Sequence, residues 1–240
     1  MLEEYILMPD DSTINEPESV KYLGVTFDNK LSFKKHIDIL GCKINRLVGI
    51  FWKCQHLTFE AKKLIYSGLV EAHLNYGIVT WASSLATNIS STHIRDHVPN
   101  CMQNIVRIQN KIVRAIFRKP KYDKTSKMHT SVTPLYKELL NVLKVSDLYY
   151  YNLAILAHDY FHSNTLPEKL AEKLDKNISE RVTRNSQLNL QYRTPHSTLM
   201  QRKPSTAISA YWNSLPSTIK ACKSRALFKS KLKTHLIESY

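Results

Sequence analysis

One stretch decides how this chain folds: residues 101–118, which read CMQNIVRIQNKIVRAIFR. At about 100° per residue, its isoleucines at positions 105, 108, 112 and 116 share one side of a helix. A narrow basic stripe occupies the opposite side and consists of Arg107, Lys111, Arg114 and Arg118. Pro120 cannot continue a helix. The stretch therefore predicts a buried helix whose solvent side is cationic.

The same spacing predicts helices on both sides of this stretch. Residues 33–53 form a long amphipathic segment, and residues 145–162 and 224–237 form two more. Thr58 is a candidate N-cap for a helix that reaches Gly77, with a predicted inner face made of Ala61, Leu64, Ile65, Leu69 and Ala72. Pro134 opens a short helix.

Other segments predict loops and one strand. Residues 20–27 read VKYLGVTF, a β-branched and aromatic run that predicts a single strand ending at the turn-forming Asp28. We expect a polar loop over residues 82–100 and irregular chain over residues 177–210. The predicted fold class is mainly α, a helical bundle with a short N-terminal β element and an irregular basic C-terminal region.

Charge points to polyanionic partners. The 240 residues contain 34 Lys and Arg against 20 Asp and Glu, a net charge of +14. Residues 1–32 contain more acidic than basic residues, whereas residues 181–237 contain eleven basic residues and no acid. Helices normally carry charges outward, so the stripe can also be a solvated face. The missing acids favour a nucleic-acid surface.

Other chemistries fail on spacing. Asp10 and Asp11 follow a proline in a polar segment that is typical of a surface turn rather than a metal site. His93 and His97 lie in a segment broken by Pro99, and we expect them to be surface histidines. The cysteines lack zinc-ligand spacing and are expected to be buried thiols: Cys42, Cys54, Cys101 and Cys222. No nucleophile elbow or phosphate-binding glycine loop occurs.

Four blocks, in order, resemble non-LTR retrotransposon (LINE-type, jockey-like) reverse transcriptases. The first is VKYLGVTFD at residues 20–28, and the second is NYG at residues 75–77 followed by Trp81. The third is IQNKIVR at residues 108–114, and the fourth is YWNSLP at residues 211–216 with the FK and LK pairs that come after it. Each block alone is weak, but the ordered set is specific.

The resemblance implies a place within a polymerase. Residues 1–32 would be a remnant of the palm edge, with Tyr22, Leu23 and Gly24 at a primer-grip-like position. Residues 33–122 would be the helical thumb, 123–133 a basic linker, 134–176 a second helical segment, and 177–240 a basic C-terminal region. Trp81 and Trp212 can stack on bases, although core packing is the preferred interpretation.

The resemblance also implies what this sequence lacks. The family's aromatic-x-Asp-Asp turn, which holds Mg²⁺ in the catalytic palm, is not matched by Asp10 and Asp11. We therefore expect no catalytic residue, no metal site and no cofactor in this chain, and no activity when it is alone.

The expected role is to bind the template and primer. Partners would be RNA, DNA or an RNA–DNA hybrid, together with the rest of the polymerase, in the nucleus or cytoplasm and not at a membrane. Besides the helical stripe, the residues expected to contact nucleic acid are Lys220, Lys223, Lys229 and Lys233. The alternatives are a helical protein-interaction module derived from a degenerate mobile element and, less favoured, an enzyme of unrecognised type.

Overall fold

The computed structural model describes residues 17–88, 98–123, 128–163, 165–175 and 188–240. Within these ranges helices dominate, and strands occur in two short antiparallel hairpins. The predicted mainly α class with an N-terminal β element is confirmed. No helix in these ranges is both long and apolar enough to cross a membrane.

The predicted single strand at residues 20–27 is wrong, because the chain reverses in its middle. Strands β1 (Ser19–Tyr22) and β2 (Val25–Asp28) pair antiparallel, with Tyr22 opposite Val25. The two turn residues, Leu23 and Gly24, have φ values of 44° and 81°. A two-residue hairpin turn of type I′ requires positive φ at both positions, which glycine adopts freely and leucine does not. The unfavourable leucine hid this turn from the sequence pattern.

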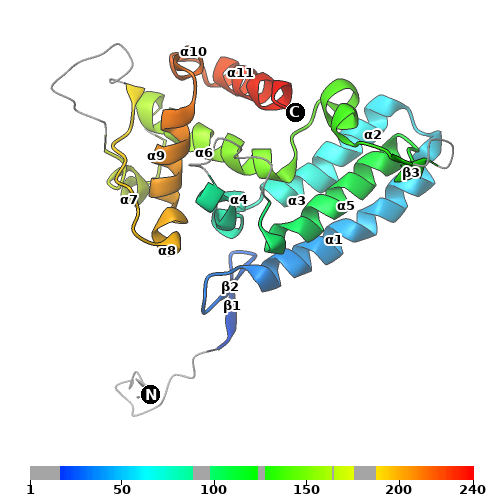
Figure 1. Ribbon diagram of the computed structural model, residues 1–240, viewed down its shortest axis with the longest axis horizontal. Helices are drawn as coiled ribbons and strands as arrows, with labels where there is room; N and C mark the ends of the chain where they lie inside the picture. Colours follow the sequence, from blue (N-terminus) through cyan, green and yellow to red (C-terminus); the bar gives the residue numbers. More distant parts are fainter. Residues whose placement is uncertain (1–16, 89–97, 124–127, 164, 176–187) are drawn as a thin grey trace.

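Helices α1 (Lys34–Lys53) and α5 (Asn100–Ile116) confirm the two longest predictions in the first half of the chain. They lie side by side and run in the same direction (Figure 1). The predicted apolar side of α5 is buried at all four isoleucines. The helix ends two residues before the predicted end, and Arg118 then adopts a left-handed φ of 52°.

The helix after Thr58 forms, but its predicted inner face is wrong. Thr58 caps α2 (Phe59–Ile65) as predicted, accepting a hydrogen bond from the Ala61 N–H at 3.3 Å. A π-helical segment, η2 (Tyr66–Glu71), then leads into α3 (Ala72–Asn75). A π-turn holds more residues than an α-turn and so shifts which side chains face inward. Through this segment Val70 and Leu74 are buried in place of the predicted Leu69 and Ala72. Leu64, which precedes the segment, is 75% exposed, and Tyr66 is buried.

The expected polar loop over residues 82–100 is corrected in its first part. Helix α4 (Ile78–Trp81) is followed by the 3-10 helix η3 (Ser83–Asn88), where Leu85 and Ala86 are buried. His93 and His97 lie outside the described residues. A short 3-10 turn, η1 (Cys54–His56), comes after α1, and β3 (Tyr122–Asp123) pairs with β4 (Met128–His129).

The second half of the chain packs around α6 (Val145–His162), as Figure 1 shows. The π-helical η4 (Leu135–Leu140) precedes α6, and helices α9 (Pro204–Ser214) and α11 (Arg225–Glu238) pack against it. Short helices complete this half: α7 (Glu168–Ala171), α8 (Thr198–Gln201) and α10 (Ser217–Lys220). The prediction of irregular chain up to residue 210 is therefore wrong from residue 198 onward.

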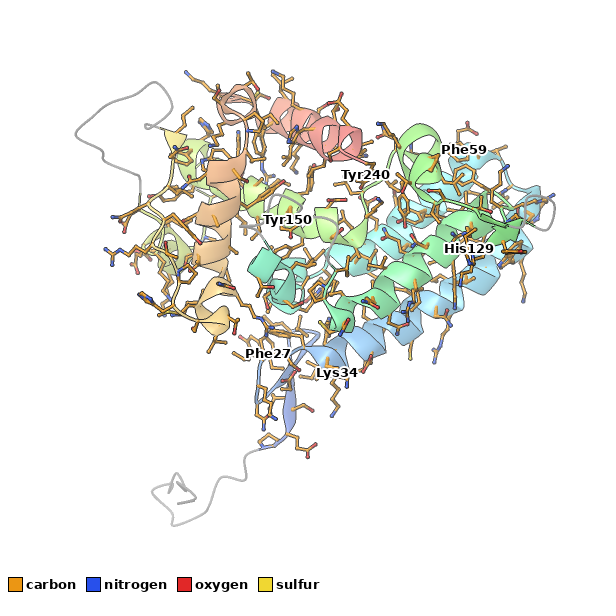
Figure 2. All side chains as sticks on the ribbon, viewed as in Figure 1. Phe27, Lys34, Phe59, His129, Tyr150 and Tyr240 are labelled. Carbon is orange, nitrogen blue, oxygen red and sulfur yellow. The ribbon has the colours of Figure 1, made fainter. Side chains whose placement is uncertain are left out.

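Aromatic side chains fill the core between these helices. Tyr150, labelled in Figure 2, stacks on Tyr211 with ring centroids 5.0 Å apart and donates a hydrogen bond to the Leu85 carbonyl at 3.1 Å. Trp81 and Trp212 are fully buried, which confirms core packing. All four cysteines are free, but of these only Cys222 is buried, so the expectation of buried thiols holds for that residue alone.

Candidate nucleic-acid interface

Helices α1 and α5 pack directly against each other. Gly41 of α1 lies against Asn104 and Ile108 of α5, so the two helices approach closely there. At the other end, the Gln55 side chain donates a hydrogen bond to the Ala115 carbonyl at 2.7 Å. These two contacts hold the helices in register along their length, so charges on one keep fixed positions relative to charges on the other.

The solvent-exposed side chains of these two helices, which together we call the α1–α5 surface, are strongly cationic. This surface has a single acid, Asp38, on the two helices. Its exposed basic side chains are Lys34, Lys35, Lys43, Arg46, Lys53, Arg107 and Lys111. Charges of one sign along two fixed helices attract a polyanion at long range. The surface also exposes Trp52, which is 50% accessible.

The predicted stripe on α5 divides into two pairs. Arg107 and Lys111 are exposed, and the Arg107 guanidinium contacts only the neighbouring Gln103 side chain, at 3.3 Å. Arg114 is half-buried and donates to the Thr130 carbonyl at 2.9 Å, and this burial lowers its pKa. Arg118 donates to the Gln55 side chain at 2.7 Å. Helical periodicity found all four but could not foresee that two already have partners within the fold.

The primer-grip-like residues form the tip of the first hairpin. Tyr22 is 65% exposed and Leu23 72% exposed. The Tyr76 hydroxyl donates a hydrogen bond to the Leu23 carbonyl at 2.6 Å, and its ring passes so close to Gly24 that a Cβ there would lie 3.2 Å from it. Gly24 is therefore required by both φ and close packing, and the tip is held against the helix that ends at Asn75.

The predicted C-terminal lysines differ in exposure. Lys220 is only 5% exposed, and its ammonium donates to the Asn189 side chain and the Asn213 carbonyl, both at 3.0 Å. Burial lowers its pKa. Lys223 is exposed, whereas Lys229 and Lys233 are half-buried. Lys220 thus links two segments inside the fold by hydrogen bonds, a structural role that sequence spacing did not indicate.

Two residues of the resemblance blocks also act as internal ties. Gln109 is buried; its amide donates to the Tyr66 hydroxyl and the Leu143 carbonyl, and its oxygen accepts from the Val145 N–H at the start of α6. Asn213 bonds both the N–H and the carbonyl of Leu190, at 2.9 and 2.8 Å. Polar ties of this kind are costly to leave half-satisfied, which explains why these positions need amides.

Among the described residues, no group of three or more His, Cys, Asp or Glu side chains could hold a metal ion. Asp10 and Asp11 lie outside the described residues.

Comparison with known proteins places this chain beside transposon polymerases. It is 25% identical over 120 residues to a probable RNA-directed DNA polymerase from transposon BS of Drosophila melanogaster. It is 27% identical over 111 residues to the corresponding protein of transposon X-element from the same organism. No family model and no solved structure matches.

The resemblance to transposon RNA-directed DNA polymerases is thereby confirmed, whereas the jockey-like type and the thumb assignment stay predictions. The matched stretches cover 48% and 45% of this chain but only 12% and 11% of the two relatives. The chain thus corresponds to a small part of such polymerases.

Proposed function

We propose that this chain is the nucleic-acid-gripping, thumb-like part of a transposon RNA-directed DNA polymerase and does not add nucleotides by itself. The observation that carries the proposal is the α1–α5 surface, with seven exposed basic side chains and one acid. Side chains that contact phosphates fix the position of a duplex without reading its sequence, which is what a polymerase needs from a grip. The similarity to RNA-directed DNA polymerases supports the choice of ligand.

The hairpin tip has a place in this proposal. Tyr22 and Leu23 are exposed at the tip of the hairpin, whose other end lies at the start of α1, where the Lys35 ammonium donates to the Ser19 hydroxyl at 2.6 Å. A strand of nucleic acid that runs along the α1–α5 surface would reach the tip at its end. We infer that Tyr22, Leu23 and Gly24 contact the primer there.

The test uses a labelled RNA–DNA hybrid and fluorescence anisotropy at several salt concentrations. Replacing Arg107 and Lys111 together with Gln should weaken binding to all sequences about equally. The slope of log K against log salt should fall by about one unit per lost contact. The control is Lys231→Gln, which removes one exposed charge from α11, a helix on the other side of α6 (Figure 1). Equal slopes for the double variant and the wild type would contradict the proposal.

A second measurement addresses activity. The chain with Mg²⁺, a primed RNA template and nucleotides should extend nothing. Template-dependent extension that is lost when Asp10 and Asp11 are replaced would overturn this part of the proposal.

A protein-interaction module is the second candidate, and the exposure of Ile50 and Trp52 on α1 favours it. An apolar interface responds little to salt, whereas several phosphate contacts respond steeply. Tight binding of a protein partner with no salt-dependent binding of nucleic acid would select this alternative.

A further inference from the structure

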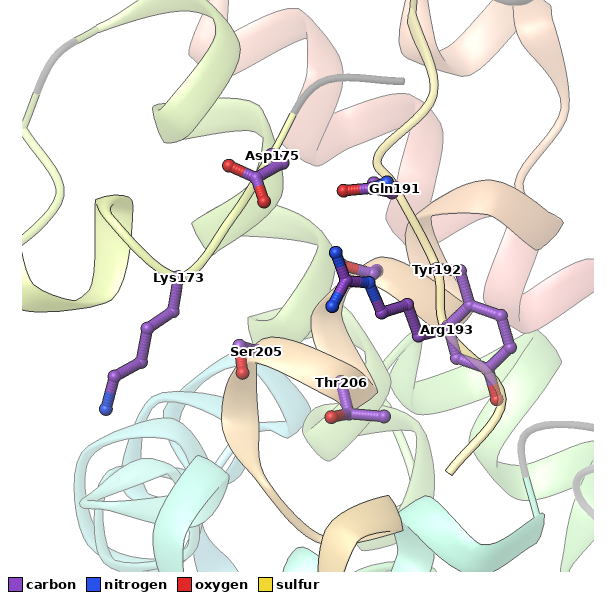
Figure 3. A pocket seen from close by; sticks show the side chains of 8 residues that line it. Lys173, Asp175, Gln191, Tyr192, Arg193, Ser205 and Thr206 are labelled. Carbon is purple, nitrogen blue, oxygen red and sulfur yellow. The ribbon is translucent and has the colours of Figure 1, made fainter. Parts of the chain in front are cut away.

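A second cationic surface lies far from α1 in the sequence, where three segments meet: the chain after α7, the extended segment 188–196 and the start of α9. Two adjoining pockets of about 210 and 850 Å³ open there. They share four lining residues, Lys173, Arg193, Ser205 and Thr206. Figure 3 shows the smaller one, which we call the α9 pocket.

Two ties hold the wall of the α9 pocket in place. The Gln191 N–H donates to the Asp175 carbonyl at 2.7 Å, which joins segment 188–196 to the chain after α7. The side chain of Asn213 binds Leu190 through both backbone groups. Arg193 comes two residues after Gln191, and its guanidinium extends into the pocket beside Ser205 and Thr206 (Figure 3).

The start of α9 lacks the usual protein partners. Its N-cap residue is Lys203, which has no acceptor atom in its side chain, and no side-chain cap bond is formed. Pro204 has no N–H, and Ala207 is the first residue whose N–H bonds back, to the Lys203 carbonyl at 3.0 Å. Among the described residues the N–H groups of Ser205 and Thr206 have no acceptor, and they lie at the helix end where the macrodipole favours a negative charge.

An independent observation comes from Ser209, one turn further along α9. Its side chain lines the α9 pocket although the residue is only 4% exposed. Within the described part of the chain, its hydroxyl forms no hydrogen bond, and it is accessible from the pocket. Residues i and i+4 share a helix face, so this hydroxyl lies on the same side as Ser205. A hydroxyl that lines a pocket and has no protein partner is available to donate a hydrogen bond to a ligand there.

The charges around the two pockets match an anion. Lys169, Lys173, Arg193 and Lys203 line them, with Asp175 as the one acid among the lining residues. In Figure 3, Arg193 lies between the Asp175 carboxylate and the side chains of Ser205 and Thr206. Tyr192, 38% exposed, also lines the α9 pocket and offers a ring on which a base can stack.

We propose that the α9 pocket binds a phosphate group of a single nucleic-acid strand. The N–H groups of Ser205 and Thr206 and the Ser209 hydroxyl donate to the phosphate, and Arg193 supplies a planar fork of donors. Tyr192 stacks on the neighbouring base. This inference rests on the proposal that the chain binds nucleic acid, and it adds a site that the α1–α5 surface does not include.

The experiment measures binding of the full chain to a labelled single-stranded RNA across salt concentrations. Arg193→Gln should weaken binding roughly tenfold and lower the salt slope by about one unit. Ser209→Ala should weaken it by about threefold with an unchanged slope, because the lost group is neutral. Asp175→Asn should tighten binding at low salt. Lys231→Gln, on α11, serves as the matched charge control.

The outcomes separate this inference from the proposed function. If the wild type binds no nucleic acid, both fail. If it binds and loses affinity on replacement of Arg107 and Lys111, but Arg193→Gln and Asp175→Asn change nothing, only the α9 pocket fails. Inorganic phosphate is the second probe, added at constant ionic strength. If phosphate raises the melting temperature of the wild type but not of Arg193→Gln, while RNA affinity is the same for both, the pocket is a free-phosphate site and the inference is overturned.

Discussion

The basic stripe of α5 and the basic C-terminal residues look alike in sequence but differ in the fold. On α5, a regular helix keeps Arg107 and Lys111 exposed, one turn apart. At the end of the short helix α10, Lys220 is buried, and its ammonium donates hydrogen bonds to the Asn189 side chain and the Asn213 carbonyl. Charge bias shows that a region is basic. Only a continuous helical period shows which basic side chains face water, and even then not which of them already have partners.

The largest expected effect tests the regularity of α5. Ile112 is fully buried on the side opposite the stripe, so Ile112→Ala should cost about 2–5 kcal/mol of the free energy of unfolding by opening a cavity. Lys111→Ala, at the neighbouring position on the exposed side, should stay within about 0.5 kcal/mol. Urea unfolding measures both. Similar losses for the two variants would mean that the two sides of α5 are not distinct.

A smaller effect tests the internal role of Lys220. Lys220→Met removes the ammonium and leaves the Asn189 side chain and the Asn213 carbonyl without their donor. The cost should be about 1–3 kcal/mol of unfolding free energy. Lys223→Met, at an exposed position, should change stability by less than about 0.5 kcal/mol. If Lys220→Met is as stable as the wild type but binds nucleic acid less well, Lys220 belongs with the surface lysines.

The same lysine predicts a pH dependence. Burial lowers the pKa of Lys220 below its ordinary value of 10.5, so the unfolded chain binds a proton more tightly than the folded chain. Stability from this group therefore rises with pH between the lowered pKa and 10.5. The stability difference between wild type and Lys220→Met should widen over this window. A difference that stays constant with pH would show that the ammonium is as well hydrated as in the unfolded chain.

The smallest effect divides the stripe itself. Arg118→Gln removes the hydrogen bond to Gln55 and should cost about 0.5–1 kcal/mol, while Arg107→Gln should be neutral in stability. For binding of the RNA–DNA hybrid the order should be reversed, with Arg107→Gln weakening binding more than Arg118→Gln. If the two variants respond equally in both measurements, Arg118, which is bonded across the fold to Gln55, and Arg107 do not differ in role.

Prediction from the sequence succeeded where helical period decides the structure and failed where rare backbone geometry intervenes. Helices α1, α5, α6 and α11 form close to their predicted ranges, because each has a long apolar period and recognisable ends. The turn at Leu23 was missed, because leucine is disfavoured at positive φ. The pattern predicts Leu69 and Ala72 on the inner face, whereas Val70 and Leu74 are buried, because nothing in the pattern indicates the π-helical turn at residues 66–71.

The candidate sites show the same division. The exposed residues that α5 contributes to the α1–α5 surface could be predicted, because the period of that one helix decides which of its side chains face solvent. The α9 pocket could not be predicted, because its residues Lys173, Arg193 and Ser209 belong to separate segments of the chain. Hydrogen bonds join these segments: the Asn213 side chain bonds the Leu190 backbone, and the Gln191 N–H donates to the Asp175 carbonyl. A site that depends on long-range ties between irregular segments leaves no period in the sequence.

The parallel arrangement of α1 and α5 also has a consequence for synthesis. Two helices that run in the same direction cannot be joined by a short turn, and the bond from Gln55 to Ala115 spans 60 positions of the chain. At translation rates of about 5–20 residues per second, α1 emerges several seconds before its partner. During that time Ile37, Leu40 and Ile44, which are buried in the finished fold, have no helix α5 to cover them. The nascent chain is then most open to aggregation or chaperone capture, and release from this state awaits the appearance of residue 116.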